Sequence, residues 1–156
     1  MTVAAGEPAV EPAYFDAALV AKFYLNEPGR DAVRRLARAS GVVVSSGIAV
    51  AEVSAAFHRK LREQAVTPAV FRALQGQFVH DVDEGLWKLA DPTAALLRDV
   101  QTAFTRLNKA VFVRSLDAIH LVTARAEGFE RIYSNDHHLL AAAKSFGLEG
   151  VDPIPR

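Results

Sequence analysis

Short apolar runs typical of strands alternate with amphipathic helical stretches along the chain, and this alternation restricts the fold more than any other feature. The expected strands lie at 13–15, 42–44, 86–89, 131–134 and around Val151. The expected helices are one that begins at Asp16, one that ends at Gly41, and those over 48–64, 67–80, 91–107, 115–128 and 137–146. Such alternation is typical of a parallel sheet with helices on both faces. The sequence therefore predicts an α/β fold with a mainly parallel central sheet.

The length and composition fit a single domain. The chain has 156 residues, and single domains most often have ~100–150. We expect one domain over 13–156 behind a mobile tail at 1–12 that is rich in alanine, proline and glutamate. The chain has no cysteine, which excludes disulfides and thiolate metal sites and agrees with a cytoplasmic protein. No apolar run approaches the ~20 residues that span a bilayer, so no membrane contact is expected.

Basic residues form two local clusters although the net charge is zero. The zero balance argues against a generally basic nucleic-acid coat. The clusters are Arg30, Arg34, Arg35 and Arg38 in one stretch and Arg59, Lys60 and Arg62 in another. Each could bind phosphate groups, or it could be the solvated face of a helix. Spacing alone does not decide between these two interpretations.

Two aspartates directly follow expected strands. Asp16 comes after Tyr14 and Phe15, and Asp136 lies just beyond Ile132 and Tyr133. In open parallel sheets the carboxyl ends of the strands line the ligand crevice, which makes both aspartates candidates for a site. Each also stands where a helix begins, so the alternative for either one is an ordinary N-cap.

Two further carboxylates lie on apolar helix faces. Glu52 falls between Ile48 and Ala55 at helical spacing, and Asp117 shares a face with Leu121. A charge on an apolar face is costly unless it is paired or bound to a metal. The alternatives are a buried ion pair with an arginine such as Arg114, or a helix edge in contact with water. Together with the two strand-end aspartates, these residues indicate one acidic crevice.

An acidic crevice of this kind suits a hard divalent cation. Mg²⁺ and Mn²⁺ prefer oxygen ligands and are held by a few carboxylates while they retain waters. No phosphate-binding glycine loop, zinc-protease motif or serine-hydrolase elbow competes as a site. His137 and His138 could suggest zinc, but adjacent side chains on a helix point in different directions, so we expect surface residues. His120 is expected to pack or to orient a neighbour.

Four segments of the chain resemble the acidic motifs of VapC-type PIN domains, in the order of that family. They are Y-F-D-A-A-L-V-A-K-F-Y-L-N-E-P-G (Tyr14 to Gly29), A-V-A-E-V-S-A-A (Ala49 to Ala56), R-S-L-D-A-I-H-L-V-T-A (Arg114 to Ala124) and I-Y-S-N-D-H-H-L (Ile132 to Leu139). The resemblance covers nearly all of the chain after the expected tail. It implies a PIN-like three-layer α/β/α sandwich, a Mg²⁺ or Mn²⁺ site, and hydrolysis of RNA phosphodiester bonds. It also implies a VapB-type antitoxin partner and a homodimer.

The resemblance assigns roles by position. The expected catalytic and metal-binding acids are Asp16, Glu52, Asp117 and Asp136. Arg114 is a candidate phosphate contact, although an ion pair with Glu52 or Asp117 is the alternative. Ser134 is a candidate substrate contact, since it keeps a hydroxyl where the family often has threonine.

The chain departs from the family pattern near its first aspartate. Family members often carry serine or threonine there, where this chain has Ala17 and Ala18. A missing hydroxyl would loosen the orientation of Asp16 or of a metal-bound water. Two other functions stay open at this stage: a solitary PIN nuclease in RNA processing, and a catalytically inert module that binds RNA or protein.

Overall fold

The computed structural model describes residues 10–155, so most of the expected tail, residues 1–9, lies outside the described residues. The helices are α1 (Ala17–Tyr24), α2 (Arg30–Ser40), α3 (Ala49–Arg62), α4 (Pro68–Asp83), α5 (Ala94–Arg106), α6 (Ser115–Ala126), α7 (His137–Ala143) and a 3₁₀ turn, η1 (Lys144–Phe146). The strands are β1 (Ala13–Tyr14), β2 (Val43–Ser46), β3 (Trp87–Ala90), β4 (Arg131–Tyr133) and β5 (Glu149–Val151). Strands and helices therefore alternate as predicted.

All paired strands run parallel. β2 lies between β1 and β3, and β4 pairs with β5. A parallel bridge between Phe15 and Tyr133 joins the two groups, and the Asp16 amide donates to the Tyr133 carbonyl at 3.1 Å. β1 and β4 are thus neighbours, and their carboxyl ends lie at the same edge of the sheet.

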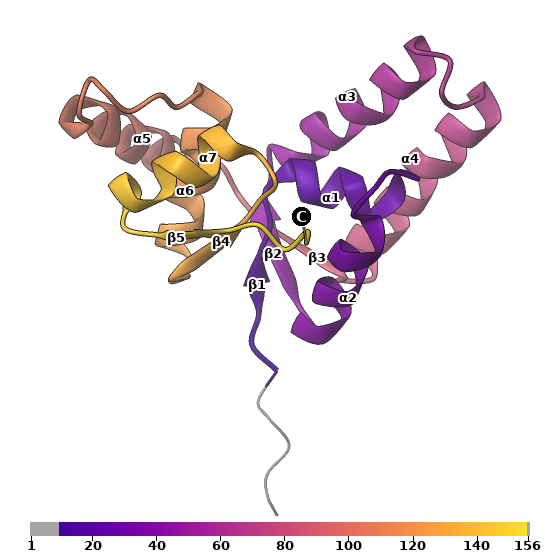
Figure 1. Ribbon diagram of the computed structural model, residues 1–156, viewed down its shortest axis with the longest axis horizontal. Coiled ribbons are helices and arrows are strands. Elements are labelled where there is room, and N and C mark those ends of the chain that lie inside the picture. Colours follow the sequence, from indigo (N-terminus) through magenta and orange to yellow (C-terminus); the bar gives the residue numbers. More distant parts are fainter. Residues whose placement is uncertain (1–9, 156) are drawn as a thin grey trace, which may run out of the picture.

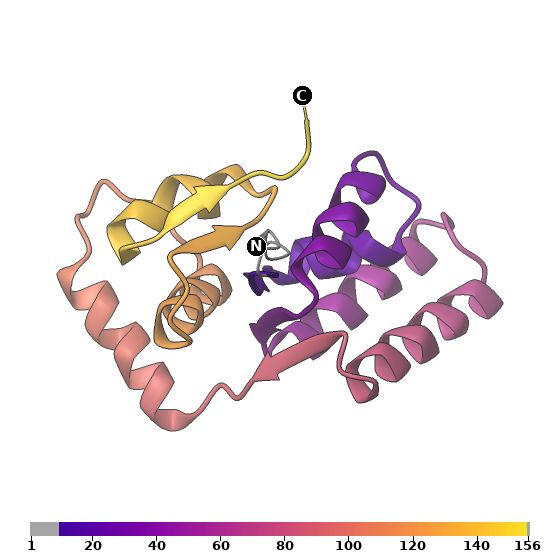
Figure 2. The same cartoon turned by 90° about the horizontal axis from the view of Figure 1, so that it is seen from below.

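Helices cover the sheet on both sides (Figures 1 and 2). Two apolar cores lie between the sheet and these helices. Successive residues of a strand point to opposite faces. Phe15 and Val43 accordingly lie in the core that α1–α4 cover, whereas Tyr14 and Val44 lie in the core beneath α5–α7. This arrangement is the expected three-layer α/β/α sandwich.

Several helix boundaries differ from the sequence prediction. The helix expected over 48–64 begins at Ala49 without a side-chain cap, because Ser45 and Ser46 before it pair in β2. Thr93, rather than Asp91, caps α5 by accepting from the Leu96 amide. The last predicted helix tightens into the 3₁₀ turn after Ala143.

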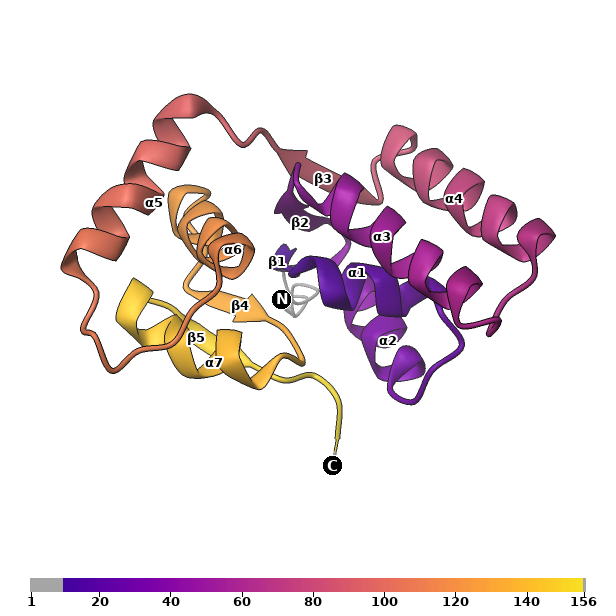
Figure 3. The ribbon, with the colours of Figure 1, turned by 90° about the horizontal axis from the view of Figure 1, so that it is seen from above.

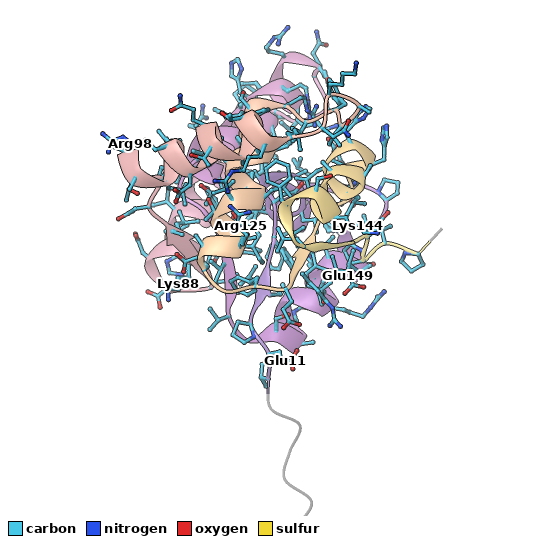
Figure 4. All side chains as sticks on the ribbon, turned by 90° about the vertical axis from the view of Figure 1, so that its left-hand side faces the viewer. Glu11, Lys88, Arg98, Arg125, Lys144 and Glu149 are labelled. Carbon is cyan, nitrogen blue, oxygen red and sulfur yellow. The ribbon has the colours of Figure 1, made fainter. Side chains whose placement is uncertain are left out.

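Charged side chains of both signs cover the side of the molecule formed by α5, α6 and β5. Figure 4 labels Arg98, Arg125, Lys144 and Glu149 there, and the mixture agrees with the zero net charge. Within residues 10–155, no helix is long and apolar enough to cross a membrane.

Candidate active site

The four acidic residues singled out from the sequence line one open cleft of about 540 Å³. Asp16 caps α1 just after β1, and Asp136 caps α7 just after β4. Glu52 lies in the first turn of α3 and Asp117 in the first turn of α6. Figure 3 looks down on this edge of the sheet, where α1, α3, α6 and α7 all begin close to the strand ends. The topology thus brings the four carboxylates into one cleft although 120 residues separate the first from the last.

Asp16 is the buried member of the set, with 4% of its surface exposed. Its Oδ1 accepts from the Leu19 amide at 3.0 Å, and its Oδ2 accepts from the Ser134 hydroxyl at 2.5 Å. Burial raises the pKa of Asp16 to about 6, and the charge of Glu52 adds to this rise, although His120 and the two hydrogen bonds oppose it. A buried carboxylate with a raised pKa is one that a cation would stabilise in its charged form.

We expect the metal-free protein to lose stability as the pH rises from about 4 to about 6. In this window the folded state binds the Asp16 proton and the unfolded state, with a carboxyl pKa of 3.8, does not. A pKa shift of this size lowers the free energy of unfolding by about 3 kcal/mol at neutral pH. Asp16→Asn removes the ionisation and remains a good N-cap. Urea unfolding in EDTA between pH 4 and 7 should show wild type falling relative to Asp16→Asn, and parallel profiles would contradict the shift.

The Glu52 carboxylate is held by a hydrogen bond to a buried histidine. The Nε2 of His120 lies 3.0 Å from Glu52 Oε1, and its Nδ1 lies 3.0 Å from the Tyr14 hydroxyl. An ionised carboxylate only accepts hydrogen bonds, so Nε2 of His120 carries a proton and donates it to Glu52. His120 and Tyr14 are almost fully buried. This chain of contacts fixes where the Glu52 carboxylate enters the cleft.

Arg114 bridges the other two carboxylates. Its Nε donates to Asp117 Oδ2 at 2.7 Å, and its Nη2 is hydrogen-bonded to Asp136 Oδ2. The backbone amides of His138 and Leu139 donate to Asp136 Oδ1. Burial would raise the pKa of Asp136, but these amides and the guanidinium outweigh it and hold that pKa below its ordinary value. Arg114 is itself half exposed, so its charge is accessible from the cleft.

The structure refines several expectations about these residues. Asp16 and Asp136 are N-caps and cleft residues at once, so the two interpretations are compatible. Arg114, the partner expected for the acids on helices, is ion-paired with Asp117, whereas Glu52 is hydrogen-bonded to His120. Ser134, the candidate substrate contact, is completely buried, and its hydroxyl links Asp16 to the Asp136 amide.

The two basic clusters do not share one role. Arg59 lines the cleft. Lys60, its neighbour, is ion-paired with Glu27 at 2.7 Å. In the first cluster, Arg34 donates to the Phe23 carbonyl and its guanidinium lies 5.2 Å from the centre of that ring. These two partnered residues stabilise the fold, while Arg59 and Arg114 supply positive charge at the cleft.

The donor chemistry of the cleft fits a hard divalent cation, because carboxylate oxygens are the ligands such ions prefer. As they stand, however, no three acidic or histidine side chains among the described residues are grouped so that they could hold a metal. Each acid is bonded to a residue of the protein instead: Asp16 to Ser134, Glu52 to His120, and the remaining two to Arg114.

Comparison with known proteins identifies the fold and the family. The family model of the PIN domain matches residues 13–145, a span that contains all four acids. The chain belongs to the PIN-domain family. It is 32% identical over 142 residues to Ribonuclease VapC46 of Mycobacterium tuberculosis, covering 90% of this chain and 96% of that protein. This PIN domain is therefore of the VapC type, as the motifs indicated.

A solved structure supports the same fold. The crystal structure of Mycobacterium tuberculosis VapC20, described as a toxin that cleaves the sarcin–ricin loop, superposes with a TM-score of 0.62. The identity is 18%, and the match covers 83% of this PIN domain and 94% of VapC20. At this identity the similarity establishes the architecture, and the chemistry must be argued from the cleft itself.

Proposed function

We propose that this PIN domain is a Mg²⁺- or Mn²⁺-dependent endoribonuclease and the toxin of a toxin–antitoxin pair. The observation that carries the proposal is the convergence of four carboxylates in one cleft at the carboxyl edge of a parallel sheet. The curated relative VapC46 is named a ribonuclease, which supports RNA as the substrate. The cleft is open rather than enclosed, so a polymer chain can pass across it.

The ion would be held, directly or through water, by Asp16, Glu52 and Asp117. Asp136 would bind it more loosely or orient the attacking water. When bound, such an ion lowers the pKa of a coordinated water and neutralises charge on the scissile phosphate. Arg114 supplies positive charge to Asp117 and Asp136, and its half-exposed guanidinium would contact the RNA phosphate.

Neighbouring residues would orient the acids. His120 donates to Glu52 and so limits its rotation. Ser134 donates to Asp16; Asp16 thus receives a hydroxyl from the residue that follows β4, although the family's usual hydroxyl is missing at Ala17 and Ala18. Partners of this kind behind metal ligands commonly change metal affinity or activity by ~10–100-fold when removed.

We expect Mn²⁺ to raise the melting temperature of the wild-type protein at neutral pH. An ion that binds only the folded state stabilises it by RT ln(1 + [L]/Kd), about 2.7 kcal/mol at ~100-fold saturation. The shift should shrink in Asp16→Asn and Glu52→Gln, because each removes a proposed ligand charge. Thermal melts with and without Mn²⁺ measure this.

Asp99→Asn provides the matched control for the Mn²⁺ melts. Asp99 is an exposed carboxylate on α5 that does not line the cleft, so its variant should respond to Mn²⁺ like wild type. A general salt effect would appear equally in every variant and with monovalent ions. Identical Mn²⁺ shifts in wild type and the two cleft variants would mean that these carboxylates do not form the ion site.

The toxin role and its partner rest on the VapC relationship. We expect the chain to arrest bacterial growth when it is produced alone, and a VapB-type antitoxin encoded by the adjacent gene to relieve the arrest. Growth curves with and without co-expression measure this. Harmless expression of a protein that cleaves RNA when purified would replace the toxin role with that of a solitary nuclease. The expected homodimer stays a prediction.

A further inference from the structure

Three rings lie together on the surface, where the first turn of α7 meets the segment before α6. They are Phe112, His137 and His138, here called the aromatic platform. The Phe112 and His138 ring centres are 4.8 Å apart at an interplanar angle of 65°. The His137 and His138 centres are 4.1 Å apart, tilted by 38°. The two histidines therefore lie against each other instead of pointing apart, contrary to the sequence expectation.

The platform is open to solvent because side chains alternate between buried and exposed in the segment before α6. Val111 and Val113 pack against the core beneath α5–α7, so Phe112 between them faces outward and is 59% exposed. A polar residue would be the ordinary choice at such an outward position. Its ring contacts His138, and the exposed part of its surface is available for a ligand.

The platform adjoins the acidic cleft. Phe112 stands two residues before Arg114, and His138 stands two residues after Asp136, the acid that Arg114 binds. The amide of His138 donates to Asp136 Oδ1 at 2.9 Å, so the platform and this acid share one backbone turn. Leu116, four residues after Phe112, is 45% exposed and lines the cleft. The surface therefore continues from the carboxylates, past the Arg114 guanidinium, to the rings.

We propose that the aromatic platform binds an unpaired nucleobase of the RNA, next to the phosphodiester bond that is cleaved; this inference rests on the proposed function. Single-stranded RNA is recognised largely by stacking of its unpaired bases on aromatic and histidine side chains. The order of groups on the surface matches that of a nucleotide, with Arg114 for the phosphate and the rings for the base. The imidazoles also offer hydrogen-bond donors to polar base edges.

The test measures RNA binding without cleavage. Binding of a short fluorescent single-stranded RNA in EDTA should be weaker for Phe112→Ala than for wild type by roughly 5- to 150-fold, the range of one base–aromatic stack. Phe112→Trp should restore the affinity, since it restores an aromatic face. Wild type and Phe112→Ala should bind an abasic oligonucleotide of the same length equally. Phe104→Ala, which changes another exposed phenylalanine away from the cleft, should bind both ligands like wild type.

Cleavage with Mn²⁺ separates failure of this inference from failure of the proposed function. Phe112→Ala should lose efficiency through KM rather than kcat. If wild type cleaves RNA and Phe112→Ala binds and cleaves it equally well, the platform does not hold a base, and a protein partner becomes the better occupant of this face. If Phe112→Ala weakens the binding of abasic and base-bearing ligands to the same extent, the proposed base stacking is also wrong. If wild type cleaves no RNA, the proposed function and this inference fall together.

Discussion

Asp117→Asn is expected to lower the rate of RNA cleavage by at least ~100-fold while the fold is retained. Asparagine keeps the shape of the side chain but removes the charge that would help to hold the cation. The side chain lies at the start of α6 and is 13% exposed, so its solvent contact is limited and its position in the cleft is well defined. Initial rates on labelled RNA with Mn²⁺, compared at equal protein concentration, measure the effect.

The interpretation depends on two controls. Far-ultraviolet circular dichroism and a thermal melt must show that Asp117→Asn is folded. Asp99→Asn, the exposed acid on α5, should cleave RNA at the wild-type rate. Full activity of folded Asp117→Asn would contradict the assignment of this acid to the site.

His120→Ala is expected to have the largest effect on stability, a loss of about 3 kcal/mol. The substitution leaves a cavity and removes the partner of both the Tyr14 hydroxyl and the Glu52 carboxylate, and buried polar groups without partners cost ~1–3 kcal/mol each. His120 is 1% exposed, so water does not readily replace it. Urea unfolding at neutral pH, in EDTA, measures the loss.

Two variants make the His120 result specific. Tyr14→Phe removes one hydrogen bond of the same chain and should cost only about 1 kcal/mol. His58→Ala removes an exposed histidine on α3 and should be close to neutral. In addition, Tyr14→Phe and His120→Gln, where folded, should weaken Mn²⁺ binding, because Glu52 is then less firmly oriented. A His120→Ala protein as stable as wild type would contradict the buried contacts.

The fold could be predicted from the sequence because its signals are local. Strand-length apolar runs and helical periodicity depend on neighbouring residues. These patterns predicted the order of strands and helices correctly. Asp16 and Asp136 could be singled out because a strand end followed by a helix start is also visible locally. In a parallel sheet such positions meet at one edge, and the structure places both in the same cleft.

The contacts that orient the acids could not be predicted, because they join residues far apart in the chain. His120 reaches Glu52 across 68 residues and Tyr14 across 106. The sequence predicted that His120 packs or orients a neighbour but not which one, since helical spacing reports only one face of one helix. Ser134 was expected at the substrate because its motif does not reveal its burial. His137 and His138 are surface residues as expected, but the contact of His138 with Phe112, on another segment, could not be predicted.

The most direct measurement is cleavage of a single-stranded RNA by the purified protein under three conditions: with Mn²⁺, with excess EDTA, and with Mn²⁺ restored after EDTA. If the cleft carboxylates hold a catalytic cation, cleavage occurs with Mn²⁺, stops in EDTA and returns when the ion is restored. Undiminished cleavage in EDTA, or no cleavage by folded protein with Mn²⁺, would contradict the proposal that this acidic cleft is a metal-dependent ribonuclease site.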